Sequence, residues 1–98
     1  MGISTQSQLS IINSILEDFD RFSKLIESRG WRIIRVRPHE QNSTVILIDK
    51  GEGETAHHLC GARYVTGIID KLSIAHNEWY RGHYFINYDD AVVDFEIR

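Results

Sequence analysis

The stretch from Thr55 to Trp79 constrains the fold most strongly, because its apolar residues follow a helical period. Polar Arg63, Asp70 and Lys71 fall on the opposite side of the helix that this spacing would form. The apolar stripe and the residues that broaden it are His58, Ala62, Val65, Ile69, Leu72 and His76, with Gly61, Ile68, Ala75 and Trp79 alongside. This pattern is typical of an amphipathic helix. It predicts a long helix that begins at an N-cap threonine, Thr55, and lies against a sheet.

A second apolar stripe predicts another long helix, from about Gln6 to Ser28. Thr5 followed three residues later by Gln8 is typical of a capping box at its start. Gly30 suits the C′ position just beyond its end. The stripe is wider than contact with one sheet usually requires, so part of it is expected to bury another surface, such as a second subunit.

Four short stretches are interpreted as strands. Trp31 to Arg37 is rich in β-branched residues and is ended by a proline. Thr44 to Ile48 shows no polar alternation, which predicts a central strand covered on both sides or lying at a subunit contact. These two stretches should form an antiparallel hairpin. His83 to Tyr88 and Val92 to Arg98 are expected to form a second hairpin around an acidic turn, with Val93, Phe95 and Ile97 on one face.

The resulting order is helix, strand, strand, helix, strand, strand (αββαββ). The simplest arrangement of these elements is a two-layer α+β sandwich, in which a four-stranded antiparallel sheet carries both helices on one face. The other face would then be free to bind something larger. With 98 residues and no linker-like stretch, the chain is expected to be a single domain, residues 1–98.

Composition restricts the partners and the cellular location that are expected for this domain. Eleven basic and fourteen acidic residues give a net charge of −3, which argues against nucleic-acid binding over the whole surface but leaves a local basic patch open. The single cysteine, Cys60, cannot form an internal disulfide, so a reducing, cytoplasmic location is expected. No stretch has the roughly 20 apolar residues that a membrane-spanning helix needs.

The aromatic residues suggest a protein-binding surface. Half of the ten aromatics, Trp79, Tyr80, Tyr84, Phe85 and Tyr88, fall within ten residues, and alternation along a strand would place Tyr84 and Tyr88 on the same side. Tyrosine and arginine together are typical of the centres of protein interfaces. The expected partner-binding residues are Trp79, Tyr80, Arg81, Tyr84, Tyr88, Arg35 and Arg37. Ordinary core packing, with the tyrosine hydroxyls left in water, is the alternative.

A basic cluster supports a second interpretation. Arg32, Arg35 and Arg37 lie close to Trp31, and arginines interleaved with aromatics can hold single-stranded nucleic acid. The alternative is a solvated strand face whose arginines pair with Asp94 and Glu96, as cross-strand ion pairs often do.

His57 and Cys60 support a third interpretation, since they are three residues apart near a predicted helix start. That placement could lower the pKa of the thiol for nucleophilic chemistry or supply two metal ligands, with His83 as a third. A small buried cysteine beside surface histidines explains the same residues.

The function expected from these patterns is a small, non-enzymatic interaction module of the inhibitor, immunity or adaptor type. It is expected to bind another protein and to form a homo-oligomer, and no cofactor or metal is assigned to it. Single-stranded nucleic-acid binding and a cysteine–histidine enzyme or metal site remain the alternatives.

Overall fold

The computed structural model describes residues 18–40, 42–52 and 61–98. Residues 18–28, the first described stretch, are helical. The elements that follow are β1 (Arg32–Pro38), β2 (Ser43–Asp49), β3 (Tyr64–Asp70), α3 (Lys71–Ala75), β4 (Tyr80–Phe85) and α4 (Tyr88–Ile97). The strands form one sheet in the order β1-β2-β3-β4, and every neighbouring pair is antiparallel. The prediction of an α+β domain built on a four-stranded antiparallel sheet is therefore confirmed.

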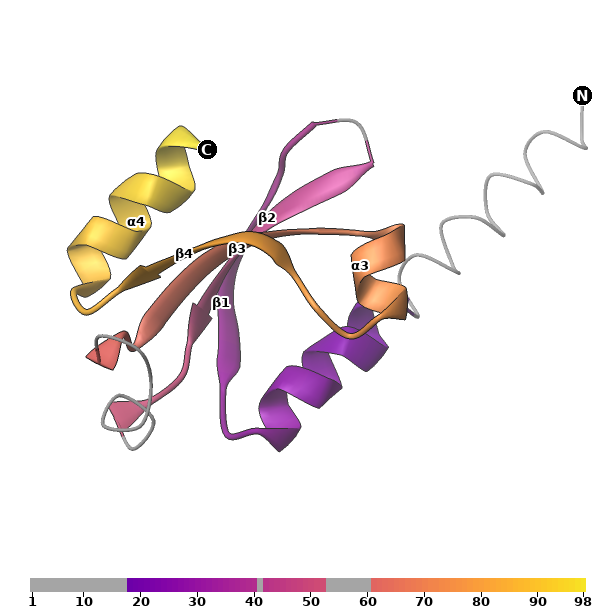
Figure 1. Ribbon diagram of the computed structural model, residues 1–98, viewed down its shortest axis with the longest axis horizontal. Helices are drawn as coiled ribbons and strands as arrows, with labels where there is room; N and C mark the ends of the chain where they lie inside the picture. The colour runs from indigo at the N-terminus through magenta and orange to yellow at the C-terminus, as the bar shows by residue number, and fades with distance from the viewer. Residues whose placement is uncertain (1–17, 41, 53–60) are drawn as a thin grey trace, which may run out of the picture.

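Helices cover both faces of the sheet. Phe22 and Ile26 of helix 18–28 and Ile74 of α3 pack on the face that carries Ile46 and Ile48, here called the α3 face. Two helices therefore lie on one face, as predicted. Ala91 and Phe95 of α4 pack on the opposite face, against Val45 and Leu47, and we call this the α4 face. In Figure 1, α4 lies across the sheet from α3 and helix 18–28.

The hairpin of β1 and β2 forms as predicted. Its pairing runs from the Arg32–Asp49 pair at one end to the Pro38–Thr44 pair at the other. Val45, Ile46, Leu47 and Ile48 are all completely buried, because alternate residues of β2 enter the two cores. The absence of alternation in this strand thus reflects cover on both sides, which was one of the two predicted explanations.

The end of the first helix also follows the prediction. Gly30 has a φ of +80°, a conformation that glycine adopts without a steric penalty. Its N–H donates to the carbonyl of Glu27 at 2.9 Å, and the N–H of Trp31 donates to the carbonyl of Ile26 at 3.3 Å. These two bonds form a Schellman motif, with Trp31 and Ile26 in the same core. The predicted start of the helix, at Thr5 to Gln8, lies outside the described residues.

The prediction of one long helix over 55–79 is wrong. Tyr64–Asp70 is a strand that pairs along its whole length with β2, and only Lys71–Ala75 is helical. Val65 and Ile69 are four residues apart, a spacing that keeps side chains on one face of a helix and equally on one face of a strand. The predicted N-cap, Thr55, lies outside the described residues. The short helix is capped instead by Asp70, whose side chain accepts from the N–H of Ser73 at 2.8 Å.

The prediction of a final strand over Val92–Arg98 is also wrong, because Tyr88–Ile97 is helical. Its N-cap is Asn87, whose side chain accepts from the N–H of Asp89 at 2.8 Å. Had this segment been a strand, Val93, Phe95 and Ile97 would share one face. In the helix only Phe95 is buried, and the other two are 59% and 77% exposed.

These two corrections change the order of elements in the second half of the chain. In the part of the chain that the structure describes, helix 18–28 and the hairpin of β1 and β2 agree with the predicted order, whereas the later elements are β3, α3, β4 and α4. The sheet face that was expected to be free is covered by α4. Within the described part of the chain, no helix has the length and apolar character needed to cross a membrane.

Candidate functional site

The sheet divides the residues that were predicted to bind a partner. Arg35 and Arg37 pair with Leu47 and Val45, so both arginines lie on the α4 face. Tyr84 pairs with Val65 and therefore lies on the α3 face. The predicted set does not form one surface. The two arginines lie on the face that α4 covers, whereas Tyr84 lies on the other face, at the β4 edge of the sheet.

Arg37 and Arg35 hold α4 against the sheet. The Nη2 of Arg37 donates to the carbonyl of Phe95 at 2.8 Å, and its guanidinium lies 5.6 Å from the centre of the Phe95 ring. Arg35 donates to the hydroxyl of Tyr88 at 3.3 Å and lies 3.6 Å from a carboxylate oxygen of Glu96. Tyr88 in turn packs edge-on against Tyr64, at 5.4 Å between ring centres. Through these contacts, the two arginines and Tyr88 fix α4 to the sheet.

The same contacts weaken the nucleic-acid interpretation. Two of its three arginines are engaged within the domain, and Arg32 lies 3.6 Å from a carboxylate oxygen of Asp49. The expected pairing of Arg35 with Glu96 is present, although Glu96 stands on a helix rather than on a strand. Asp94 pairs with His83 instead.

Trp79 and Tyr84 occupy space that two glycines leave open. A Cβ built on Gly67 would lie 2.7 Å from Cδ1 of Trp79. A Cβ on Gly82 would lie 2.9 Å from Nε1 of Trp79 and 3.0 Å from the hydroxyl of Tyr84. The ammonium of Lys50 lies 5.6 Å from the centre of the Tyr84 ring, within the range of a cation–π contact. Tyr84 nevertheless remains 57% exposed, so its outer side is available to a partner.

Tyr80 and Arg81 lie where β4 is irregular. The register of β3 and β4 shifts between Thr66 and Ile68, and Arg81 has a φ of +52°. Burial and the neighbouring carboxylate of Asp70 raise the pKa of Tyr80. The bulge breaks the regular pairing edge of β4, and bulges of this type are known to discourage edge-to-edge association of sheets.

A polar network that sequence reasoning missed joins β3, β4 and α4. Asp94 Oδ2 accepts from the hydroxyl of Thr66 at 2.5 Å and lies 3.0 Å from Nδ1 of His83. Arg98 donates to the same hydroxyl at 3.1 Å and to the carbonyl of Arg81. Burial acts to raise the pKa of Asp94, but the hydrogen bonds from Thr66 and His83 outweigh it, so the pKa lies below its ordinary value. Burial lowers the pKa of Arg98.

The charge state of Asp94 determines which ring nitrogen of His83 carries the proton. An ionised carboxylate only accepts hydrogen bonds, so Nδ1 of His83 is the donor and Nε2 of the neutral ring keeps its lone pair. The His83 side chain is 51% exposed. No sequence motif indicates this network, because its members come from three elements that are distant along the chain.

The third predicted site cannot be placed. His57 and Cys60 lie outside the described residues, and His83 is engaged with Asp94. Among residues 18–40, 42–52 and 61–98, no three His, Cys, Asp or Glu side chains are grouped to hold a metal ion.

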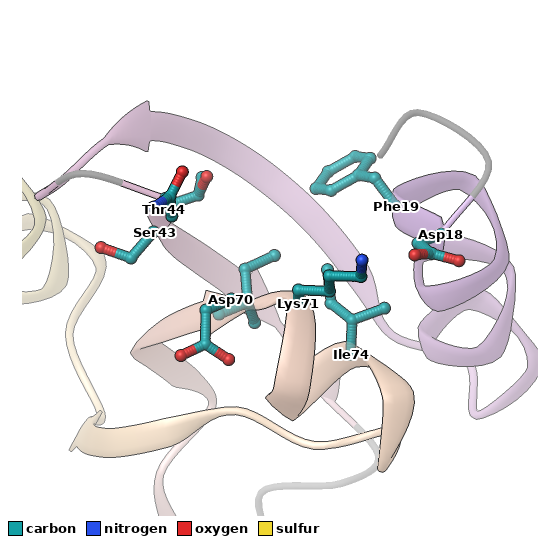
Figure 2. Close-up of a pocket in the computed structure, with 9 residues that line it drawn as sticks. Asp18, Phe19, Ser43, Thr44, Asp70, Lys71 and Ile74 are labelled. Atoms are coloured by element: carbon teal, nitrogen blue, oxygen red, sulfur yellow. The ribbon is translucent and has the colours of Figure 1, made fainter. Parts of the chain in front are cut away.

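A cavity of about 420 Å³ lies between the start of helix 18–28, α3 and the start of β2. Figure 2 shows Phe19 and Ile74 on either side of it, with Thr44 across from them. The acidic Asp70 on its rim is already engaged as the N-cap of α3. The remaining residues around it are Asp18, Asn42, Ser43, Ile69 and Lys71.

Exposed apolar side chains are concentrated in one segment of the described chain, residues 80–97. Among the described residues, eight large hydrophobic side chains are exposed, and six of them belong to residues 80–97. Ile86, Val93 and Ile97 are the most exposed of these six, at 70%, 59% and 77%. We call the surface that β4, α4 and their connection expose the β4–α4 surface, and its large apolar members are Tyr80, Tyr84, Ile86, Tyr88, Val93 and Ile97. Tyr84 is the member that lies on the α3 face of the sheet.

Comparisons with protein families, with curated proteins and with solved structures found no match for this chain.

Proposed function

We propose that this domain is a non-enzymatic module that binds another protein through the β4–α4 surface. The observation that carries the proposal is the concentration of exposed aliphatic and aromatic side chains in residues 80–97. Single exposed apolar residues are ordinary in a monomer, whereas a group of them is typical of an interaction surface. The proposal keeps Tyr80, Tyr84 and Tyr88 from the residues predicted for partner binding.

Energetics support this choice. Burying an exposed isoleucine or valine completely is worth roughly 1.5–3 kcal/mol. Ile86, Val93 and Ile97 are mostly in water, so a partner that covered them would gain several times that amount before the cost of association. Arg35 and Arg37 would contribute indirectly, because their contacts hold α4 in place.

Site-directed photo-crosslinking tests the proposal. A photoreactive phenylalanine analogue is placed at Ile86 or Ile97, and the full chain is irradiated in the cells that naturally express it. Val36 on β1 is the matched control, since it is 53% exposed and stands on the edge strand opposite β4. We expect discrete protein adducts from positions 86 and 97 and none of the same mass from position 36. Absence of adducts at 86 and 97, or the same adducts at all three positions, would refute the proposal.

A further inference from the structure

The outer face of α4 combines an apolar ridge with acidic flanks. Val93 and Ile97 are four residues apart, so they lie on the same side of the helix, one turn from each other. Each is more than half exposed. With 3.6 residues per turn, Asp90 falls on one side of this ridge and Asp89 and Glu96 fall on the other.

The acidic flanks are mostly uncompensated. Within the part of the chain that the structure describes, Asp89 and Asp90 have no basic side chain within ion-pair distance, and Glu96 has only the exposed contact with Arg35 at 3.6 Å. Exposed pairs of this kind contribute little. Asp94, the remaining acid of the helix, faces His83 and Thr66 instead. Because Arg35, Arg37 and Arg98 contact the carboxyl-terminal half of α4, the uncompensated negative charge is concentrated beside the amino-terminal half of the ridge, at Asp89 and Asp90.

From this arrangement we propose that the outer face of α4 binds an amphipathic helix of a partner protein, in which an apolar stripe is flanked by lysines or arginines. This inference rests on the proposed function and names the chemistry of the partner. Ridges formed by residues four apart pack into the grooves of a second helix. Basic residues beside the partner's stripe would face Asp89, Asp90 and Glu96, as charges flanking the contact of paired helices do.

The charge distribution disfavours the other occupants. A second copy of α4 packed against this face would bring like charges together. Anionic lipid and nucleic acid carry the same sign of charge as the flanks and would be repelled. A cationic partner is the one that the acidic flanks attract, and its rate of association should fall as salt is added.

Two synthetic peptides of 18 residues test the inference with the full chain. Both carry the same leucine stripe at helical spacing, and the flanking residues are lysine in one and glutamate in the other. Binding is measured by fluorescence anisotropy at low and moderate salt. We expect the lysine peptide to bind, and its affinity should fall by about tenfold between low and moderate salt. At low salt it should bind at least about tenfold more tightly than the glutamate peptide.

Variants locate the contact on the molecule. Val93→Ser and Ile97→Ser should each lower the affinity for the lysine peptide by about tenfold. Asp90→Asn should remove part of the salt dependence. Leu72→Ser, which changes an equally exposed residue on α3, should leave binding unchanged. Since all four side chains are exposed or lie on the helix surface, circular dichroism should show an intact fold.

Several results would overturn the inference. Equal binding of the two peptides would show that charge plays no part, and binding unaffected at Val93 and Ile97 would show adsorption to acidic surface elsewhere. No binding at all would also overturn it. A dimer seen by sedimentation that is lost in Ile97→Ser would assign the face to a second copy. Each of these results is compatible with protein adducts at Ile86, so the proposed function stands or falls separately.

Discussion

Truncation of three side chains in α4 distinguishes the helix from the strand that the same residues resemble. In the alternating pattern, Val93, Phe95 and Ile97 share one face, and truncating each to alanine should be costly. In the structure, Phe95 is 3% exposed and packs with Val45 and Leu47, whereas Val93 and Ile97 are mostly in water. The three substitutions should therefore differ sharply in their effect on stability.

The expected magnitudes follow from burial. Phe95→Ala removes a buried aromatic ring from a small core, which typically costs about 3–5 kcal/mol. The contact of the Arg37 guanidinium with the ring, at 5.6 Å from its centre, is lost as well. Val93→Ala and Ile97→Ala remove side chains that are mostly exposed, so little buried apolar surface is lost. Both replace a β-branched residue by alanine, the best helix former, so each should change stability by less than about 0.5 kcal/mol.

Urea unfolding followed by the fluorescence of Trp31 and Trp79 measures these differences. The free energy of unfolding of a small domain is about 5–15 kcal/mol, so Phe95→Ala should lower the midpoint strongly at an unchanged slope. Val93→Ala and Ile97→Ala act as matched controls on the same helix. If either of these two costs more than about 2 kcal/mol, the assignment of α4 and of its outer face is wrong.

Three further predictions concern the packing of Trp79, the cap of the first helix and the network at Asp94. Gly67→Ala should cost about 1–3 kcal/mol in urea unfolding, because its new Cβ would lie 2.7 Å from Cδ1 of Trp79; an unchanged midpoint would contradict that packing. Gly30→Ala meets no atom within 4 Å but must adopt a φ of +80°, so we expect a smaller cost of about 1 kcal/mol from the backbone alone, and a larger one would point to a contact that the structure lacks. The pKa of Asp94 is lowered on folding, so its contribution is present above the unfolded pKa of about 3.9 and is lost as pH falls through the lower folded value. The stability of the wild-type protein should thus fall on acidification across this window. The Asp94→Asn variant should be less stable than the wild type at neutral pH, and its stability should change less with pH across the same window. Identical pH profiles for the two proteins would contradict the network.

The candidate site was only partly predictable, since the residue types were informative but their placement was not. Arg35 and Arg37 share a strand face, as alternation predicts. Whether that face is free depends on α4, and the contacts of Arg37 with Phe95 cross 58 positions of the chain. The signals that could have revealed α4 were present in the sequence: Asn87 as an N-cap, followed by acidic Asp89 and Asp90 in the first turn.

Features that depend only on neighbouring residues could be predicted from the order of the amino acids. The end of the first helix follows from Gly30, and the central position of β2 follows from an unbroken run of apolar residues that no solvated strand could carry. The cover of the sheet depends on long-range packing, and so in part does the state of residues 64–70. The spacing of Val65 and Ile69 suits both a helix and a strand, although the four β-branched residues of this stretch favour a strand. Pairing with β2 and β4, supplied by residues far along the chain, decided in favour of the strand.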